Sequence, residues 1–254
     1  MPWESLLITM MGSLRALGVV LALPSLGGRP LPPMLRAALS FFLGGLLASV
    51  APGAGPSIDP AATGALVVAA FHEVLLGLAM GLVIRTALST AELAGRLIAG
   101  EVGLTAAPGF DVPVPSQEPL PSFIGMFGGL MFFLLHAHEG VLAAFARSFA
   151  LAPAGAGGLN PLAAETLVRA VAELLELALR MAAPFIALNF VITLGFSILG
   201  RAVPKMNVFI LSYSLRSLFG LLLLAGGGTL FARYLSDMFD VLPWTILELV
   251  ARRG

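Results

Sequence analysis

Residues 61–88 read AATGALVVAAFHEVLLGLAMGLVIRTAL, a stretch that is almost entirely apolar or small apart from His72, Glu73 and Arg85. A helix needs about 20 mainly apolar residues to cross the hydrocarbon core of a bilayer. The apolar run is longer than that and does not alternate with polar residues, as the strands of a membrane barrel would. It therefore predicts a membrane helix.

Five further blocks have the same character, at residues 5–26, 34–50, 122–149, 167–199 and 208–235. Runs rich in Gly and Pro at 27–33, 52–56 and 153–158 separate several of them. The predicted fold class is all-α: a polytopic, hydrophobic helical-hairpin membrane protein with about six hydrophobic helical segments, some of them kinked. Pro184 lies inside the fifth block, which is compatible with two shorter helices or one bent helix.

We predict one integral-membrane domain, residues 1–254. Residues 1–11 carry Glu4 and no basic cluster, and an A-x-A cleavage pattern is missing, so we expect a retained first helix and not a removed signal peptide. Residues 236–254 are more polar and are expected to form an amphipathic C-terminal tail.

Composition supports a membrane protein and narrows its function. Of the 254 residues, 58% are hydrophobic and 11% are charged, against about 25% charged in an ordinary soluble domain. Lipid or a large assembly must cover the apolar surface. The formal net charge is zero, so no basic excess favours a nucleic-acid partner. The absence of cysteine excludes disulfides, thiol nucleophiles and thiolate metal sites.

Glycines inside the apolar blocks predict close helix packing. Gly77 and Gly81 stand one helical turn apart, and further candidates are Gly44, Gly45, Gly125, Gly128, Gly129, Gly195 and Gly220. In lipid, helices associate where small residues let their backbones approach. The pattern does not decide between packing within one chain and packing between subunits.

Charged residues inside the apolar blocks are costly unless they are paired or hydrated. Glu precedes Arg by four residues at three places, which favours local ion pairs on helices. These places are Glu92 with Arg96, Glu165 with Arg169, and Glu176 with Arg180. The alternative is a polar wall along an aqueous path.

No motif indicates catalysis or a cofactor. His136, His138 and Glu139 suggest a metal or proton-relay site, but histidines two residues apart do not share a helical face, and a polar turn is the simpler interpretation. The chain contains no HExxH, no G-x-S-x-G and no phosphate-binding loop. We therefore predict that it has no catalytic residues and no cofactor.

A proline-rich segment between the third and fourth blocks is the most unusual stretch. Residues 103–121 read GLTAAPGFDVPVPSQEPLP, with five prolines and no basic residue. It cannot form a regular helix, and it is too apolar for a simple disordered linker. Irregular backbone among hydrophobic helices is tolerated where it is buried in protein or lines a water-filled cavity. The segment is either a solvent-facing connection or an ordered plug.

Three stretches of this sequence are similar to one family. EVLLGLAMGL at 73–82 resembles the pattern E-I-L-I-G-x-x-x-G-F. AGRLI at 94–98, with GLT at 103–105 and Asp111, resembles A-G-x-x-I…G-L-S/A followed by Asp-Pro. APF at 183–185 and GRAVPKMNVF at 200–209, with Arg216 and Gly220, resemble N-R-x-x-P-Q-L-N-I-F…K…G. The family is that of the flagellar biosynthetic protein FliR, whose virulence counterpart is the T subunit of type III secretion export gates.

The chain departs from the family pattern at several positions. Arg216 replaces a frequent Lys, Lys205 replaces Gln, and Val112 separates Asp111 from Pro113. The proline run is also denser than is typical. The resemblance nevertheless covers nearly the whole chain in the same order.

The resemblance implies a non-enzymatic core subunit of a protein-export gate. Such a subunit would form a pore with the P and Q partners, associate with the B and A export-apparatus proteins, and conduct unfolded substrates. It would lie in the bacterial inner membrane at the flagellar basal body, in contact with lipid and not with nucleic acid.

The resemblance also assigns roles to individual residues. It implies a pore plug or gating loop formed by Gly103, Leu104, Pro108, Gly109, Phe110, Asp111, Pro113, Pro115 and Pro119, with Gly103 and Gly109 as hinges. Family-motif and assembly positions would be Glu73, Gly77, Gly81, Gly95, Pro184, Arg201, Pro204, Asn207, Phe209, Arg216 and Gly220. Asn207 is expected to hold a turn through its side chain, and Arg201 and Arg216 to contact acidic partners or the membrane surface.

Other functions stay open from the sequence. The gate could belong to an injectisome, the subunit could be purely structural, or the chain could be a small-solute secondary transporter. A transporter would use broken helices, often in paired repeats, and Pro184 provides one break without a matching second half.

Overall fold

The structure, a computed structural model, describes residues 2–22, 32–50, 63–104, 119–156, 158–203 and 207–250. The chain divides into two compact units that are both discontinuous in sequence. Unit 1 comprises residues 1–87, 132–172 and 238–254, and unit 2 comprises residues 88–131 and 173–237. Four of the helices begin in one unit and end in the other.

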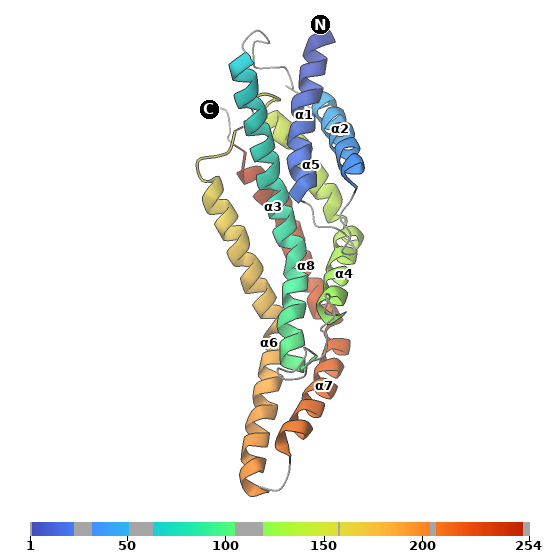
Figure 1. Ribbon diagram of the computed structural model, residues 1–254, viewed down its shortest axis with the longest axis vertical. Coiled ribbons are helices and arrows are strands. Elements are labelled where there is room, and N and C mark those ends of the chain that lie inside the picture. The colour runs from blue at the N-terminus through green and yellow to red at the C-terminus, as the bar shows by residue number, and fades with distance from the viewer. Residues whose placement is uncertain are drawn as a thin grey trace. The chain divides into compact units, whose positions relative to one another are not determined.

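The described ranges contain helices and no named strand (Figure 1). The helices are α1 Pro2–Ala22, α2 Pro33–Val50, α3 Thr63–Val102, α4 Pro119–Leu134, α5 Ala137–Leu151, α6 Ala163–Ala202, α7 Val208–Gly226 and α8 Gly228–Glu248. This confirms the predicted all-α class.

The six predicted blocks are recovered as helices or helix pairs. Among the described residues, α1, α3 and α6 are each long and apolar enough to cross a membrane, and α2 is a shorter apolar helix. The fourth block is α4 and α5, bent by 65° at a short break, and the sixth is α7 and α8, bent by 57°. Counting each bent pair as one span gives up to five spans.

Several predicted boundaries were wrong. The third block ends at Val102 and not at residue 88, because Ser89 and Thr90 do not interrupt a helix that continues through helix-favouring residues. The fifth block is one 40-residue helix that runs through Pro184. The sixth block breaks at Gly227, and α8 then continues through most of the predicted tail to Glu248.

The break between α4 and α5 has no Gly or Pro. His136 there adopts a left-handed conformation with φ 56°, and its Nδ1 lies 2.9 Å from Oε1 of Glu139. This confirms the polar turn predicted for the histidine motif. The described residues contain no group of three or more His, Asp or Glu side chains arranged to hold a metal ion.

In unit 1, glycines set the closest helix approaches. A Cβ on Gly12 of α1 would lie 2.6 Å from the carbonyl oxygen of Gly44 in α2, and one on Gly18 would lie 2.6 Å from the carbonyl oxygen of Val74 in α3. The neighbours are backbone atoms that cannot move aside. The prediction of small-residue packing is therefore confirmed within this chain, with α1 lying between α2 and α3 (Figure 1).

Unit 2 contains a second set of close approaches. A Cβ on Gly128 of α4 would lie 2.5 Å from Cβ of Ala91 in α3, and one on Gly220 of α7 would lie 2.5 Å from Cγ2 of Val102. Gly195, by contrast, has open space around it. The ring centroids of Phe185 in α6 and Phe231 in α8 lie 6.2 Å apart.

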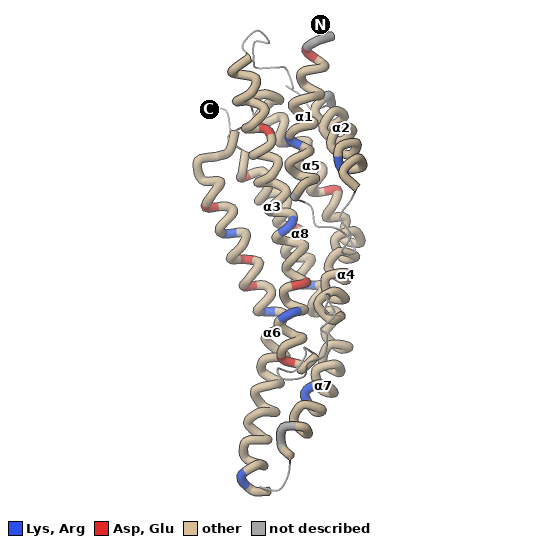
Figure 2. Tube along the Cα trace, viewed as in Figure 1, with Lys and Arg blue, Asp and Glu red and all other residues tan. Residues whose placement is uncertain are grey.

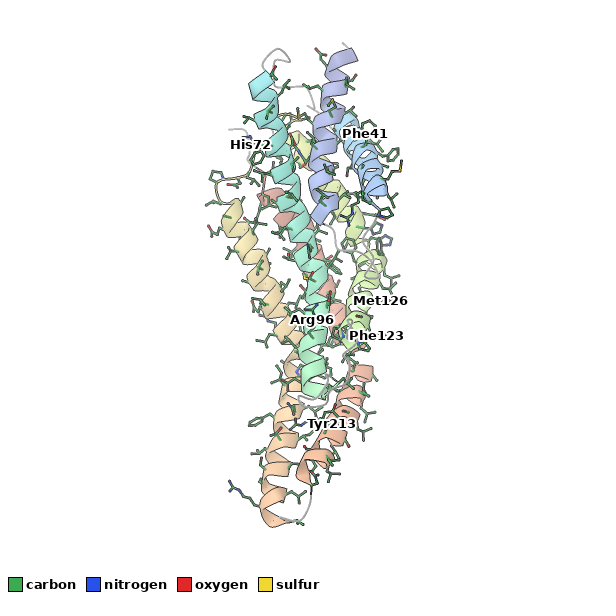
Figure 3. The ribbon with its side chains drawn as sticks, viewed as in Figure 1. Phe41, His72, Arg96, Phe123, Met126 and Tyr213 are labelled. Carbon is green, nitrogen blue, oxygen red and sulfur yellow. The ribbon has the colours of Figure 1, made fainter. Side chains whose placement is uncertain are left out.

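Both units expose large apolar side chains. Phe41 on α2 is 60% exposed, and Phe123 and Met126 on α4 are 64% and 69% exposed (Figure 3). Charged positions are sparse along the helices (Figure 2). Such a surface is stable only against lipid or protein.

Candidate functional sites: a buried ion pair and the anchors of the proline-rich segment

A buried ion pair joins α1 to α3 inside unit 1. Nε of Arg15 lies 2.5 Å from Oε2 of Glu73, and its Nη2 lies 2.9 Å from Oε1. Both side chains are 0% exposed. The two parallel bonds form the bidentate arrangement that is the strongest geometry for a guanidinium and a carboxylate.

Further partners complete this pair. Arg15 donates from Nη1 to Oγ of Ser148 and from Nη2 to the carbonyl oxygen of Ala152, both at 2.9 Å. The backbone N–H of Gly155 donates to Oε1 of Glu73 at 2.9 Å. The guanidinium carbon lies 4.1 Å from the centroid of the Phe149 ring. The pair therefore connects α1 and α3 to α5 and to the connection that follows α5.

The sequence predicts only half of this site. Glu73 stands out as a charge in an apolar block, whereas the motifs in the sequence do not indicate Arg15 as its partner. The missed signal is that Arg15 is the only basic residue in the apolar block at 5–26. Opposite charges in two apolar segments predict a buried pair, because an unpaired charge there is costly.

The first end of the proline-rich segment is held by α7 in unit 2. Gly103 has φ 74°, a conformation that favours glycine, and its carbonyl oxygen accepts a hydrogen bond from the hydroxyl of Tyr213. A Cβ on Gly103 would lie 2.9 Å from Cε2 of the Tyr213 ring. Ser217 donates to the carbonyl oxygen of Val102 at 3.0 Å. Figure 3 labels Tyr213 on α7.

The second end of the segment packs on α3. Pro119 begins α4, and a Cβ on Gly95 of α3 would lie 2.8 Å from Cα of Pro121. The intervening residues 105–118 lie outside the described part of the chain. The last turns of α3 and the facing part of α7 thus fix the points where the segment leaves and rejoins the helices.

A line of polar side chains runs beside the first anchor. Asn189 of α6 donates to Oε2 of Glu101 at 2.5 Å, and Thr193 lies 3.3 Å from Oδ1 of Asn189. Arg216 of α7 donates to Oγ1 of Thr193 at 3.1 Å. The line thus begins at the carboxylate of Glu101 and ends at the guanidinium of Arg216, with the amide of Asn189 and the hydroxyl of Thr193 between them. The surrounding helices are otherwise mainly apolar.

The other predicted motif residues have distinct positions. Gly77 packs on the backbone of Arg15, and Gly81 is buried. Asn207 caps α7, accepting a hydrogen bond from the backbone N–H of Ile210 at 3.4 Å, as expected for a turn-holding side chain. Arg201 is exposed near the end of α6, and Leu104 follows α3.

Some predicted residues cannot be placed. Those outside the described residues are Pro108, Gly109, Phe110, Asp111, Pro113, Pro115 and Pro204. Phe209 lies in α7, but its side chain is outside the description. The plug role stays a prediction.

Two of the three local ion pairs are confirmed. Glu92 with Arg96 and Glu176 with Arg180 lie at 2.7 Å and 2.5 Å. The predicted pairing of Glu165 with Arg169 is wrong, because Arg169 instead lies 3.5 Å from Glu248 of α8. Arg169 therefore pairs with a residue of another helix, Glu248, and not with Glu165 one turn away on its own helix.

These features define an α-helical membrane protein. Its helices approach one another closely at glycines and enclose a buried ion pair. A family model described as bacterial export proteins, family 1, matches residues 6–242, and the chain belongs to that family.

Its relatives include three proteins named flagellar biosynthetic protein FliR. The one from Caulobacter vibrioides is 28% identical over 209 residues, 82% of each chain. The one from Aquifex aeolicus is 28% identical over 225 residues, 87% of this chain and 85% of the relative. The one from Escherichia coli is 25% identical over 241 residues, 93% and 91% of the two chains.

Proposed function

We propose that this chain is a component of the flagellar export apparatus, acting as a core subunit of the flagellar-type protein-export gate. Together with P and Q partner subunits it would form the pore through which unfolded export substrates pass, in the bacterial inner membrane at the basal body. Family membership and the shared name of the relatives support this role. The exposed apolar side chains on both units supply surface for partner subunits and lipid.

The proposed mechanism is steric and needs no catalytic residue. Residues 103–121 would close the pore at rest and be displaced by a translocating chain. The single observation that carries this is that the segment is anchored at both ends within unit 2, at Gly103 by Tyr213 and at Pro121 by Gly95. Prolines restrict the free chain, so ordering such a segment costs less conformational entropy than ordering a Gly/Ser loop.

Removal of residues 108–119 tests the plug directly. Resting cells that carry the deletion should leak small ions or solutes, whereas cells with the parent chain should not. A second variant replaces the same residues with Gly and Ser at equal length, which keeps the connection and removes the stiffness and apolar character. Unchanged permeability in both variants would eliminate the plug.

A single hydroxyl provides a finer test of the anchor. Tyr213→Phe removes the hydrogen bond to the carbonyl oxygen of Gly103 and keeps the ring that packs on it. We expect a smaller leak than the deletion gives. Tyr234→Phe is the matched control because Tyr234, the other tyrosine of the chain, has no part in this anchor.

Purification tests the assembly apart from the plug. A gate subunit should co-purify with two other small hydrophobic proteins. A chain that purifies alone as a stable homo-oligomer and moves a small metabolite would instead support the secondary-transporter alternative. A virulence injectisome gate of the same family would share the assembly but export a different set of substrates.

A further inference from the structure

A cavity of about 920 Å³ in unit 1 has no part in the proposed gate. It lies where the last turn of α5, the first turns of α6 and the last turn of α8 come together. Ligand pockets in proteins commonly have volumes of about 300–1,000 Å³, so this cavity is large enough for a small molecule or a lipid head group.

The wall of the cavity is mainly apolar and includes a partly exposed tryptophan. Leu151, Leu162 and Leu247 contribute to it, and Trp244 is 63% exposed. Tryptophan is enriched where membrane helices reach the head groups, because its ring is apolar and its N–H is polar. Three helix ends and an exposed indole are typical of the depth at which membrane helices reach the lipid head groups. We therefore expect the cavity to lie at that depth.

Four charged side chains line the same cavity, two of each sign. Arg169 and Glu248 lie 3.5 Å apart and are about half exposed. Arg147 of α5 and Glu165 of α6 also line it, and neither forms an ion pair with any residue that the structure describes. Because Arg169 turns to Glu248, the carboxylate of Glu165 is left available together with the guanidinium of Arg147.

An available cation and an available anion on two helices match a ligand that carries both charges. A guanidinium binds phosphate through parallel N–H donors. A carboxylate accepts charge-assisted hydrogen bonds from a primary ammonium. The face of Trp244 adds an attraction for a cation. A purely anionic head group would satisfy Arg147 but face Glu165, and a quaternary ammonium has no N–H to donate.

We propose that this cavity binds the head group of phosphatidylethanolamine, with Arg147 on the phosphate, Glu165 on the ammonium, and the apolar wall against the start of the acyl chains. The site is separate from the proline-rich segment and does not depend on the export function.

The test uses the full-length chain with Trp3→Phe, which leaves Trp244 as the single tryptophan. The protein is placed in nanodiscs that contain equal amounts of phosphatidylethanolamine, phosphatidylglycerol and phosphatidylcholine. One lipid at a time carries brominated acyl chains, which quench a nearby indole. We expect the strongest quenching from brominated phosphatidylethanolamine.

Two substitutions separate the roles. Arg147→Gln should weaken binding of all three lipids. Glu165→Gln should remove the preference for phosphatidylethanolamine and leave binding of phosphatidylglycerol and phosphatidylcholine unchanged. Loss of one charge-assisted hydrogen bond corresponds to about a tenfold change in relative affinity. Glu176→Gln on α6 and Arg96→Gln are matched controls outside the cavity and should leave the preference unchanged.

Three results would overturn the proposal. Equal quenching by the three lipids in the parent chain would show that the cavity does not select a head group. A preference that survives both Arg147→Gln and Glu165→Gln would place selection elsewhere. Full competition by soluble phosphoethanolamine at the concentration of the lipid would identify a free zwitterion, and not a membrane lipid, as the ligand.

Discussion

Two kinds of ion pair in this chain use the same chemistry and differ in what surrounds them. Arg15 and Glu73 in unit 1 are fully buried and share three further hydrogen-bonding partners. Glu176 and Arg180 in unit 2 lie 2.5 Å apart on one helix, but their side chains are 60% and 62% exposed. Distance alone therefore does not indicate the importance of an ion pair.

The two kinds of pair differ in what surrounds each charge after its partner is removed. An exposed side chain that loses its partner is hydrated, so the pair contributes at most about 1 kcal/mol. A buried side chain that loses its partner keeps its charge in a medium of low polarity, which costs several kcal/mol. The buried pair also joins three helices, α1, α3 and α5, so its loss affects how all three pack.

The largest effect is expected from breaking the buried pair. Arg15→Gln leaves Glu73 charged and without its main partner, and should lower the free energy of unfolding by about 3–5 kcal/mol. Unfolding in mixed detergent micelles measures this value. Arg96→Gln, which breaks an exposed pair, is the control. A loss of less than 1 kcal/mol in Arg15→Gln would remove the distinction between the two kinds of pair.

A double substitution sharpens the same comparison. Arg15→Met with Glu73→Leu removes both charges, so the double variant should be less destabilised than the sum of the two single variants by about 1–3 kcal/mol. Replacing Arg15 removes the partner of Ser148, and replacing Glu73 removes the partner of the Gly155 N–H. The double variant loses both bonds, which keeps it below the parent. Additive single losses would mean that the two charges do not depend on each other.

Glycine substitutions compare the two units through packing. Gly77→Ala adds a methyl group against the backbone of Arg15 and Gly18, and overpacking of this kind costs about 1–3 kcal/mol. Gly195→Ala in unit 2 meets open space and should be neutral, or stabilising by up to about 1 kcal/mol through helix propensity. The same unfolding assay applies, and equal losses at the two sites would refute close backbone packing at Gly77.

The smallest effect is expected from the exposed pair. Glu176→Gln should change the free energy of unfolding by about 0.5 kcal/mol or less, and added salt should reduce even that difference. Unfolding of the parent and the variant at low and at high salt measures it. A larger effect that persists at high salt would contradict the solvent-exposed position of this pair on α6.

The sequence predicted the helices better than their ends. Apolar blocks of about 20 residues identified every segment, since membrane helices are recognised from composition alone. The breaks at His136 and Gly227 were not predicted, although the first coincides with the proposed polar turn. Neither break contains proline, while Pro184 lies within an unbroken helix. The break at Gly227 falls in the glycine run at 226–228, a breaker signal that was missed, whereas the break at His136 has no such signal and the proline signal at Pro184 does not end α6.

The candidate sites divide in the same way. The sequence identified Glu73, Gly77, Gly95, Asn207 and the ends of the proline-rich segment, each through a residue type with limited uses in an apolar environment. It did not reveal Arg15 as the partner of Glu73, Tyr213 as the donor to Gly103, or Glu248 as the partner of Arg169. Each of these contacts joins residues more than 50 positions apart, and no local spacing encodes them.

By itself, the sequence determined that this chain is helical, that it needs lipid or protein around it, and that its helices can approach closely at glycines. These properties depend on composition and on neighbouring residues. The tertiary structure decided which charges are paired and which side chains anchor the proline-rich segment. It also left Arg147 and Glu165 facing one cavity, because pairing depends on which distant helices meet.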